Sequence, residues 1–293
     1  MSQPELVVDA RAQLGEGPVW DERAQELIWV DIVGQMVHRF RPSDGRVTSL
    51  SVPKAVGAVA IRSHGGLVLA LEDGFWILDL PDAEPRPFAL LDPPAPGILR
   101  MNDGKVDREG RFWAGTTAWD DRAGDGAGAL YRLDPDGGLR RMLDGVSISN
   151  GLDWDPDGRL MYFVDTPTQR IDVFDYDGLS GEIERRRTLV EVPHAAGAPD
   201  GLTVDAEGGI WVALWGGSAV HRYTPEGTLE RTLHVPASQV SSCAFGGRQL
   251  DELYVTTAAI DLPPDEAARQ PHAGGLFRCR PGVRGRPAGL FAG

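Results

Sequence analysis

Four side chains that carry oxygen ligands occupy one equivalent place in a repeated strand–turn–strand segment. Each stands five residues before the residue that opens a turn, and they are Glu16, Asn102, Asn150 and Asp200. Gly57 and Ser241 hold the same place in two further segments. Carboxylate and amide oxygens suit a hard divalent cation such as Ca²⁺ or Mg²⁺ better than a metal that prefers thiolate or imidazole. The pattern therefore predicts a divalent-cation site wherever these segments converge.

Each of these residues also has an ordinary structural interpretation. Asn150 is followed by glycine, a favoured pair for a hairpin turn, and Asn102 begins a second stretch that is rich in turn formers. Asp200 could cap a loop, and Glu16 could face solvent. The common register argues for a joint role, because the chain has only two asparagines and both fall at this place.

The elements that must position these residues are short strands in six similar segments. The turns are opened by Asp21, Arg62, Asp107, Asp155, Asp205 and Gly246. These residues stand 41, 45, 48, 50 and 41 positions apart. Four short strands in every ~40–50 residues are typical of a propeller blade. We therefore predict an all-β, six-bladed β-propeller with four antiparallel strands per blade, forming one domain over residues 1–293. A β-sandwich with accidental repeats is the alternative.

A ring of blades has to be closed, and residues 5–8 offer the means. They form an apolar strand that precedes the first segment and has no blade of its own. We predict that this strand pairs with the C-terminal strands in the last blade. A helical stretch is expected only over residues 264–269, for one or two turns.

The first strand of a propeller blade lines the central channel, so equivalent residues lie at equal height around the axis. The four oxygen-bearing residues should therefore meet at one mouth of the channel. Arg100, two residues before Asn102, shares its face of an extended strand and could hold a ligand oxygen. Asp120 follows in a loop, residues 119–128, that could fold over the mouth as a lid. A solvent-facing arginine and a flexible loop are the alternatives.

The second strand of each segment returns to the same rim. Its end should bring a further set of side chains close to the mouth, namely Asp31, Thr116, Thr117, Asp165, Trp215 and Thr257. Of the eight tryptophans, Trp119 and Trp215 are the two that we expect in a pocket, because the others fall at strand positions typical of a core.

Charge and composition exclude several functions. The net charge of −14 and the pI near 4.8 argue against nucleic acid as a partner, because phosphate binding needs a basic surface. No apolar run approaches the ~18 residues of a membrane span, and the N-terminus lacks a basic and apolar leader. Cys243 and Cys279 are too few for a disulfide scaffold. We expect a soluble, cytoplasmic protein without a membrane partner. Nucleophile-elbow, P-loop and zincin motifs do not occur.

Several motifs together resemble those of the senescence-marker-protein/gluconolactonase/regucalcin family. They are Leu14-Gly15-Glu16-Gly17-Pro18, Asn102-Asp103-Gly104-Lys105-Val106-Asp107, Ser149-Asn150-Gly151-Leu152, Asp172-Val173-Phe174-Asp175-Tyr176-Asp177 and Pro199-Asp200-Gly201-Leu202-Thr203-Val204-Asp205. The resemblance spans residues 14 to 280 and implies a six-bladed propeller with one divalent metal ion that hydrolyses sugar lactones.

The resemblance also implies roles for individual residues. By motif match, the metal ligands are Glu16, Asn150 and Asp200, with Asp200 also the candidate general base. Arg100 and Asn102 hold the substrate. Asp120 stands where some relatives carry glutamate, and we assign it to substrate binding. The residue before Pro199 is Ala198, where relatives carry bulkier side chains. The differences at Asp120 and Ala198 both concern the identity of the substrate.

These inferences predict a metal-dependent lactonase that opens an aldonolactone of the gluconolactone or xylonolactone type. Ca²⁺ is the expected ion, with Zn²⁺, Mg²⁺, Mn²⁺ or Fe²⁺ as alternatives. A small-molecule sugar lactone is the expected partner. Two other functions stay open, namely hydrolysis of organophosphates or aryl esters and a non-enzymatic role as a calcium-binding regulatory protein.

Overall fold

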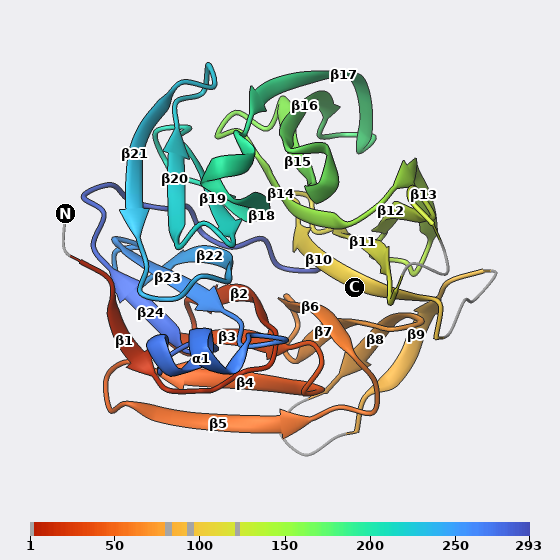
Figure 1. The fold of residues 1–293 in the computed structure, drawn as a ribbon. Coiled ribbons are helices and arrows are strands. Elements are labelled where there is room, and N and C mark those ends of the chain that lie inside the picture. Colours follow the sequence, from red (N-terminus) through yellow and green to blue (C-terminus); the bar gives the residue numbers. More distant parts are fainter. Residues whose placement is uncertain (1–2, 80–83, 93–96, 121–123) are drawn as a thin grey trace.

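The computed structural model of the chain describes residues 3–79, 84–92, 97–120 and 124–293. Within these ranges, six sheets of four antiparallel strands stand side by side in a ring (Figure 1). This arrangement is a six-bladed β-propeller and confirms the fold expected from the repeats. The described residues include no helix that is long and apolar enough to cross a membrane.

The strands follow one another from the inner to the outer edge of each blade. The first blade contains β2 (Gly15–Asp21), β3 (Glu26–Asp31), β4 (Met36–Arg41) and β5 (Arg46–Ser51). The second contains β6 (Val56–Ile61), β7 (Leu67–Leu71), β8 (Gly74–Leu78) and β9 (Arg86–Leu90). The third contains β10 (Leu99–Val106), β11 (Phe112–Ala118), β12 (Gly128–Leu133) and β13 (Leu139–Val146).

The remaining blades follow the same plan. The fourth contains β14 (Ser149–Trp154), β15 (Leu160–Asp165), β16 (Arg170–Asp177) and β17 (Glu182–Glu191). The fifth contains β18 (Ala198–Val204), β19 (Ile210–Trp215), β20 (Ala219–Tyr223) and β21 (Leu229–His234). The sixth contains β22 (Val240–Gly246), β23 (Glu252–Thr257), β24 (Leu276–Cys279) and β1 (Glu5–Val8). Among the described residues, three short helices lie between strands, namely η2 (Thr166–Thr168), η3 (His194–Ala196) and α1 (Pro264–Arg269).

The ring is closed by the N-terminal strand, as predicted. β1 pairs antiparallel with β24, so that Glu5 lies opposite Arg278. The guanidinium of Arg278 donates a hydrogen bond of 2.6 Å to the Glu5 carboxylate. Residues from the two ends of the chain thus share one sheet, which resists opening of the ring at this blade.

The aspartates that open the turns explain why the hairpins form where they do. Asp205 accepts hydrogen bonds from the backbone N–H groups of Glu207 and Gly209, which close the turn between β18 and β19. Its second oxygen accepts from the indole of Trp211, 2.9 Å away, and from Arg222. Asp107 makes the equivalent bonds in the third blade. One side chain therefore fixes both the turn and the strand that follows it.

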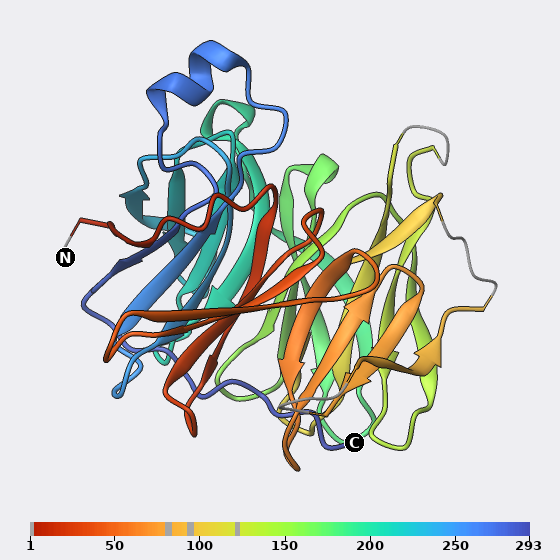
Figure 2. The same ribbon diagram turned by 90° about the horizontal axis from the view of Figure 1, so that it is seen from below.

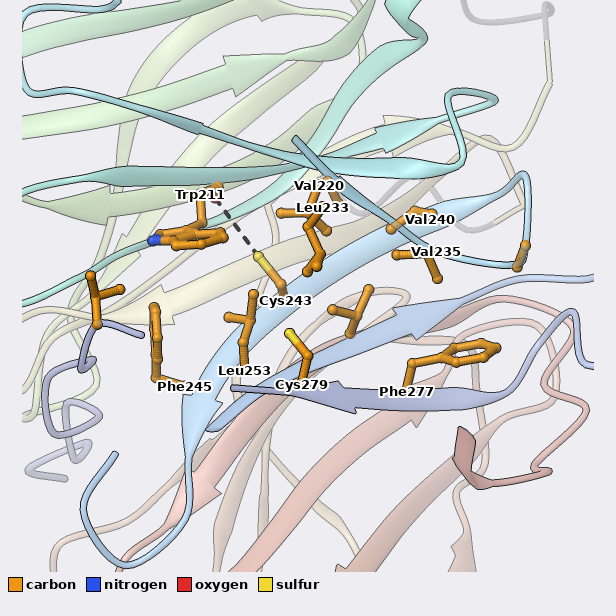
Figure 3. Close-up of a cluster of buried hydrophobic side chains, with 14 residues drawn as sticks. Trp211, Val220, Leu233, Val235, Val240, Cys243, Phe245, Leu253, Phe277 and Cys279 are labelled. Carbon is orange, nitrogen blue, oxygen red and sulfur yellow. Dashed lines mark hydrogen bonds between the residues drawn. The ribbon is translucent and has the colours of Figure 1, made fainter. Parts of the chain in front are cut away.

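The hydrophobic core is divided among the interfaces between neighbouring blades. Figure 3 shows one such interface, where Trp211 of the fifth blade packs against Phe245 and Cys243 of the sixth. The thiol of Cys243 points toward the carbonyl of Trp211, 3.8 Å away. Both cysteines are buried and unpaired. Because each blade covers the apolar face of the next, no blade has a complete core by itself.

The C-terminal tail crosses the face of the ring opposite to α1 (Figure 2). Its backbone bonds successively to loops of the other blades, with Arg284 accepting from Ala206 and Phe291 bonding to Ile61 and Ser63. Ala292 donates to the carbonyl of Gly110. The tail therefore spans the lower mouth of the central channel, which we define as the mouth opposite α1.

Candidate functional site

All six innermost strands are interrupted by a β-bulge or similar irregularity at the same height. The register shifts lie between Glu16 and Val19 in β2 and between Met101 and Gly104 in β10. The shift in β14 begins at Ser149, and the other three innermost strands have equivalent shifts. A bulge bends the strand locally and re-aims its side chains. The candidate residues therefore sit where the strands depart from regular alternation.

The glycines that follow two of the candidate residues allow the innermost strands to approach one another closely. A Cβ atom at Gly151 would lie 2.3 Å from the backbone nitrogen of Leu202. A Cβ atom at Gly201 would lie 2.1 Å from the hydroxyl oxygen of Ser242. Asn150 and Gly151 lie within the strand β14 and do not form a hairpin turn. The glycine instead allows close packing against β18.

The amides of the site form a continuous chain of hydrogen bonds. Asn102 donates from Nδ2 to Asn150 Oδ1, 2.9 Å away, and to the carbonyl of Ser149. Asn150 donates in turn to the hydroxyl of Thr166 at 2.7 Å, and Thr166 donates to the carbonyl of Pro199. These bonds fix the direction of both amide oxygens. They also connect β10, β14 and β18, three of the strands that supply candidate residues.

Three carboxylic acids are buried together at this level of the channel. Burial raises the pKa of Glu16 and Asp200 well above its usual range, and the neighbouring Asp103 raises both further. Burial also raises the pKa of Asp103 to about 6, although Lys105 opposes the shift. Glu16 and Asp200 lie within hydrogen-bonding reach of each other. The cluster thus holds more negative charge than its protein surroundings neutralise.

The donor set fits a divalent cation. Asp200 Oδ1 is buried and finds no hydrogen-bond partner among the described residues. The Glu16 carboxylate accepts a bond from the backbone N–H of Gly17 at 2.8 Å. A cation would satisfy the unpaired oxygen and the excess charge together. In the described part of the chain no three His, Cys, Asp or Glu side chains form a metal cage by themselves, so the set relies on the amide oxygen of Asn150.

Arg100 stands beside the amides, and two residues outside the motifs, Trp119 and Glu72, lie close to it. Its guanidinium donates to Asn102 Oδ1 at 2.5 Å and lies 5.3 Å from the ring centre of Trp119. The indole of Trp119 donates to Glu72 at 3.1 Å. Burial lowers the pKa of Arg100 to about 10, against the attraction of Glu16 and the other carboxylates. Arg100 therefore stays cationic at neutral pH, with an aromatic ring beside it.

Two of the predicted rim residues, Asp31 and Asp165, bind backbone N–H groups. The carboxylate of Asp31 accepts from the N–H groups of Gln13 and Leu14, just before Glu16. Asp165 accepts in the same way from Ser147 and Ile148, just before Asn150. Their oxygens hold the segments that lead into the innermost strands.

The remaining predictions fall at or beyond the edge of this arrangement. Asp120 is exposed and follows Trp119 after the end of β11. The predicted lid over residues 119–128 includes residues 121–123, which lie outside the described residues. The structure thus brings together Glu16, Arg100, Asn102, Asn150 and Asp200.

Sequence reasoning missed Asp103, Glu72 and Thr166 as neighbours of the site. Asp103 falls in the stretch Asn102-Asp103-Gly104, which is rich in turn formers. In a regular strand, moreover, alternation would turn Asp103 away from the face that Asn102 presents. The register shift in β10 removes that alternation. The available signal was that an acidic residue, Asp103, directly follows Asn102 in the motif. Only the bulge in β10 explains how it comes close to the site.

Fold and site together define a class, namely six-bladed β-propellers that present buried carboxylate and amide oxygens at one mouth of the channel. The chain belongs to the SMP-30/Gluconolactonase/LRE-like family, whose profile matches residues 14–259. This finding confirms the resemblance inferred from the motifs.

Individual relatives match over nearly the whole length. The chain is 42% identical over 293 residues to a Bacillus subtilis (strain 168) protein named "Putative sugar lactone lactonase YvrE", with 98% of each chain covered. It is 41% identical to regucalcin of Xenopus laevis, covering 99% of this chain and 98% of that one. The solved structure of a calcium-binding protein, regucalcin, from Agrobacterium tumefaciens superimposes with a TM-score of 0.93 at 30% identity, covering 99% and 97%.

Proposed function

We propose that the protein is a metal-dependent sugar lactonase that hydrolyses an aldonolactone of the gluconolactone or xylonolactone type to the open aldonic acid. The observation that carries the proposal is the pairing of two features at one mouth of the channel. The first is a buried carboxylate cluster in which Asp200 Oδ1 has no partner among the described residues. The second is the adjacent Arg100–Asn102 pair, which offers hydrogen-bond donors beside that cluster.

Glu16, Asn150 and Asp200 would hold the divalent cation, with Ca²⁺ as the expected ion. When bound there, a divalent cation supplies positive charge that polarises a lactone carbonyl. The hydrogen bond from Asn150 Nδ2 to Thr166 fixes the orientation of the amide, whose oxygen accepts from Asn102 and keeps a second lone pair for the cation. The names of the relatives support this assignment, because one is called a sugar lactone lactonase and another a calcium-binding protein.

Asp200 is the candidate general base. Burial raises the pKa of Asp200, which favours acceptance of a proton and supports this role. In the proposed reaction a water oxygen bonds to the lactone carbonyl carbon while Asp200 accepts the water proton. The bond between that carbon and the ring oxygen then breaks, and the ring oxygen takes up the proton as a hydroxyl group. The product is one aldonic acid for each water consumed.

Arg100 and Asn102 would orient the hydroxyl groups of the sugar. A guanidinium carries five N–H donors, and the bonds described for Arg100 use only its Nη1 atom. The ring of Trp119 and the carboxylate of Glu72 restrict the motion of this side chain. Asp120, exposed beside Trp119, is the candidate contact for a more distant part of the substrate.

Acid release from a panel of aldonolactones tests the proposal, using cation-free protein and protein restored with Ca²⁺, Mg²⁺, Mn²⁺ or Zn²⁺ separately. Cation-restored hydrolysis of one lactone supports it and identifies substrate and ion together. No acceleration over the spontaneous rate with any ion contradicts it. An aryl ester and an organophosphate belong in the same panel, and tight Ca²⁺ binding without turnover of any compound would indicate a binding protein.

A further inference from the structure

A second polar layer lies in the channel below the candidate cation site, with Asp153 at its centre. This carboxylate is buried and accepts five hydrogen bonds. The donors are Lys105 Nζ at 3.0 Å, Arg286 Nη2 at 3.0 Å, the Val204 N–H at 2.9 Å, the Trp154 N–H at 2.8 Å and Thr203 Oγ1 at 3.3 Å. Lys105 and Arg286 lower the pKa of Asp153 and outweigh the effect of burial. Asp153 is therefore a fully satisfied anion.

The lower layer is built by the same three strands that supply the candidate site. Lys105, Asp153 and Thr203 each stand three residues after a site residue, namely Asn102, Asn150 and Asp200 respectively. At roughly 3.3 Å per strand residue, the two layers are about 10 Å apart along the channel wall. Lys105 also donates to the carbonyl of Leu202 at 2.9 Å, so one ammonium reaches from β10 across β14 to β18.

The fourth contributor is the C-terminal tail. Arg286 donates to Asp153 and also to the carbonyls of Trp154 at 2.6 Å and Val204 at 3.3 Å. The backbone on either side of it is anchored, because Gly285 donates to Leu250 before it and Phe291 donates to Ile61 after it. Residues 286–290 of the tail and the charged side chains of the lower layer line a cavity of about 660 Å³.

We propose that Asp153 is a positioning residue for the candidate cation site and that Arg286 of the C-terminal tail completes this function. The bonds at Asp153 set the distances among β10, β14 and β18, and these distances determine whether Asn102, Asn150 and Asp200 converge. The tail, which is distant from the site in sequence and lies across the opposite mouth, thereby controls the geometry of the ligands. The inference rests on the cation site of the proposed function.

Cation binding tests this role by a readout that general stability does not move. Cation-free wild-type protein and R286M are titrated with Ca²⁺, Mg²⁺, Mn²⁺ and Zn²⁺ in separate calorimetric experiments, and the Tm of each cation-free protein is measured. We expect R286M to bind the preferred cation about tenfold more weakly, and R286K to recover most of the loss. Removing a positive charge would by itself tighten the binding of a cation. Weaker binding therefore indicates lost geometry.

Arg231 provides the matched control. It also anchors the C-terminal segment, donating to the carbonyl of Pro281 at 2.9 Å, but it lies on β21 at the outer edge of its blade. We expect R231M to lower the Tm while it changes cation affinity less than twofold. If R286M does not fold, R286Q replaces it, because glutamine also removes the positive charge but keeps a hydrogen-bond donor; we expect a smaller loss of affinity in the same direction.

Unchanged or tighter cation binding by folded R286M or R286Q would overturn the proposal. Wild-type protein that binds a cation but opens no lactone would contradict the proposed function and leave this test intact. Wild-type protein that binds none of the four cations would overturn both.

Discussion

The two polar layers of the channel contain buried aspartates with opposite electrostatic behaviour. Burial raises the pKa of Asp200 in the upper layer, whereas the pKa of Asp153 in the lower layer is lowered despite equal burial. The difference lies in the partners. Asp153 accepts five hydrogen bonds, two of them from cationic side chains, while Asp200 Oδ1 has no partner among the described residues. A satisfied carboxylate stabilises the fold, and an unsatisfied one is available to a ligand.

The largest expected effect is a loss of lactone turnover when Asp200 of the upper layer is replaced. Asp200→Asn removes the candidate base and one charge of the cation site, so lactone turnover should fall by at least ~10³-fold. The far-UV circular dichroism spectrum should stay unchanged, because the side chain keeps its shape. Near-normal turnover by folded D200N would exclude Asp200 as the base.

The free energy of unfolding in urea should depend more on Asp153 than on Asp200. Asp153→Asn leaves Lys105 and Arg286 without their shared anion, and breaking a buried ion pair costs about 3–5 kcal/mol. Asp200→Asn in cation-free protein at pH 8 should instead stabilise the fold by about 1 kcal/mol, because it removes repulsion and adds an amide donor near Glu16. Equal destabilisation by the two variants would remove the distinction between the layers.

Much of the upper layer could be predicted from sequence, because its residues share one register and that register repeats. The signal is an oxygen-bearing side chain at the equivalent position of each repeat, as at Glu16, Asn102, Asn150 and Asp200. The lower layer could not be predicted, because the role of Asp153 depends on its bond with Arg286. Arg286 lies 133 positions later, in a tail without regular secondary structure. No periodicity connects these two residues.

The errors within the site have local physical causes. Asp103 lies close enough to Glu16 and Asp200 to raise the pKa of both, and it stands at the bulge of β10, whose position depends on contacts between strands. Asp31 was correctly placed toward the rim by the hairpin geometry, but its carboxylate binds the backbone of Gln13 and Leu14. Spacing alone can place a side chain at a given height; whether that side chain remains available depends on neighbouring segments.

The pH dependence should also separate the layers. Folding raises the pKa of Glu16 and Asp200, so the folded cation-free protein binds protons more tightly than the unfolded chain does. Their contribution to stability is therefore present at low pH and is lost as pH rises above the unfolded values of ~4. A cation requires the deprotonated carboxylates, so its stabilising effect should be greater at pH 8 than at pH 5.

Urea unfolding at both pH values, with and without Ca²⁺, measures this effect. Asp153 should contribute equally at pH 5 and pH 8, because its lowered pKa places its loss of stability below the unfolded value of ~3.9. A cation-induced gain in stability that is the same at the two pH values would contradict the raised pKa of Glu16 and Asp200.

The smallest expected effect concerns the residues that hold Arg100. Trp119→Ala removes a cation–π contact at a partly exposed site, worth about 0.5–1 kcal/mol, and releases Glu72 from its bond with the indole. KM for the lactone should therefore rise about two- to fivefold while kcat changes little, because the proposed role of Arg100 is to bind substrate and not to transfer the proton. Trp119→Phe keeps an aromatic face, so its KM should lie between those of the wild-type protein and W119A. Trp215→Ala, at the rim of the fifth blade and without a described contact to Arg100, serves as the control. A fall in kcat at constant KM for W119A would instead place Arg100 and its aromatic neighbour in the chemical step, and the upper layer would then extend beyond the carboxylates and amides assigned to it.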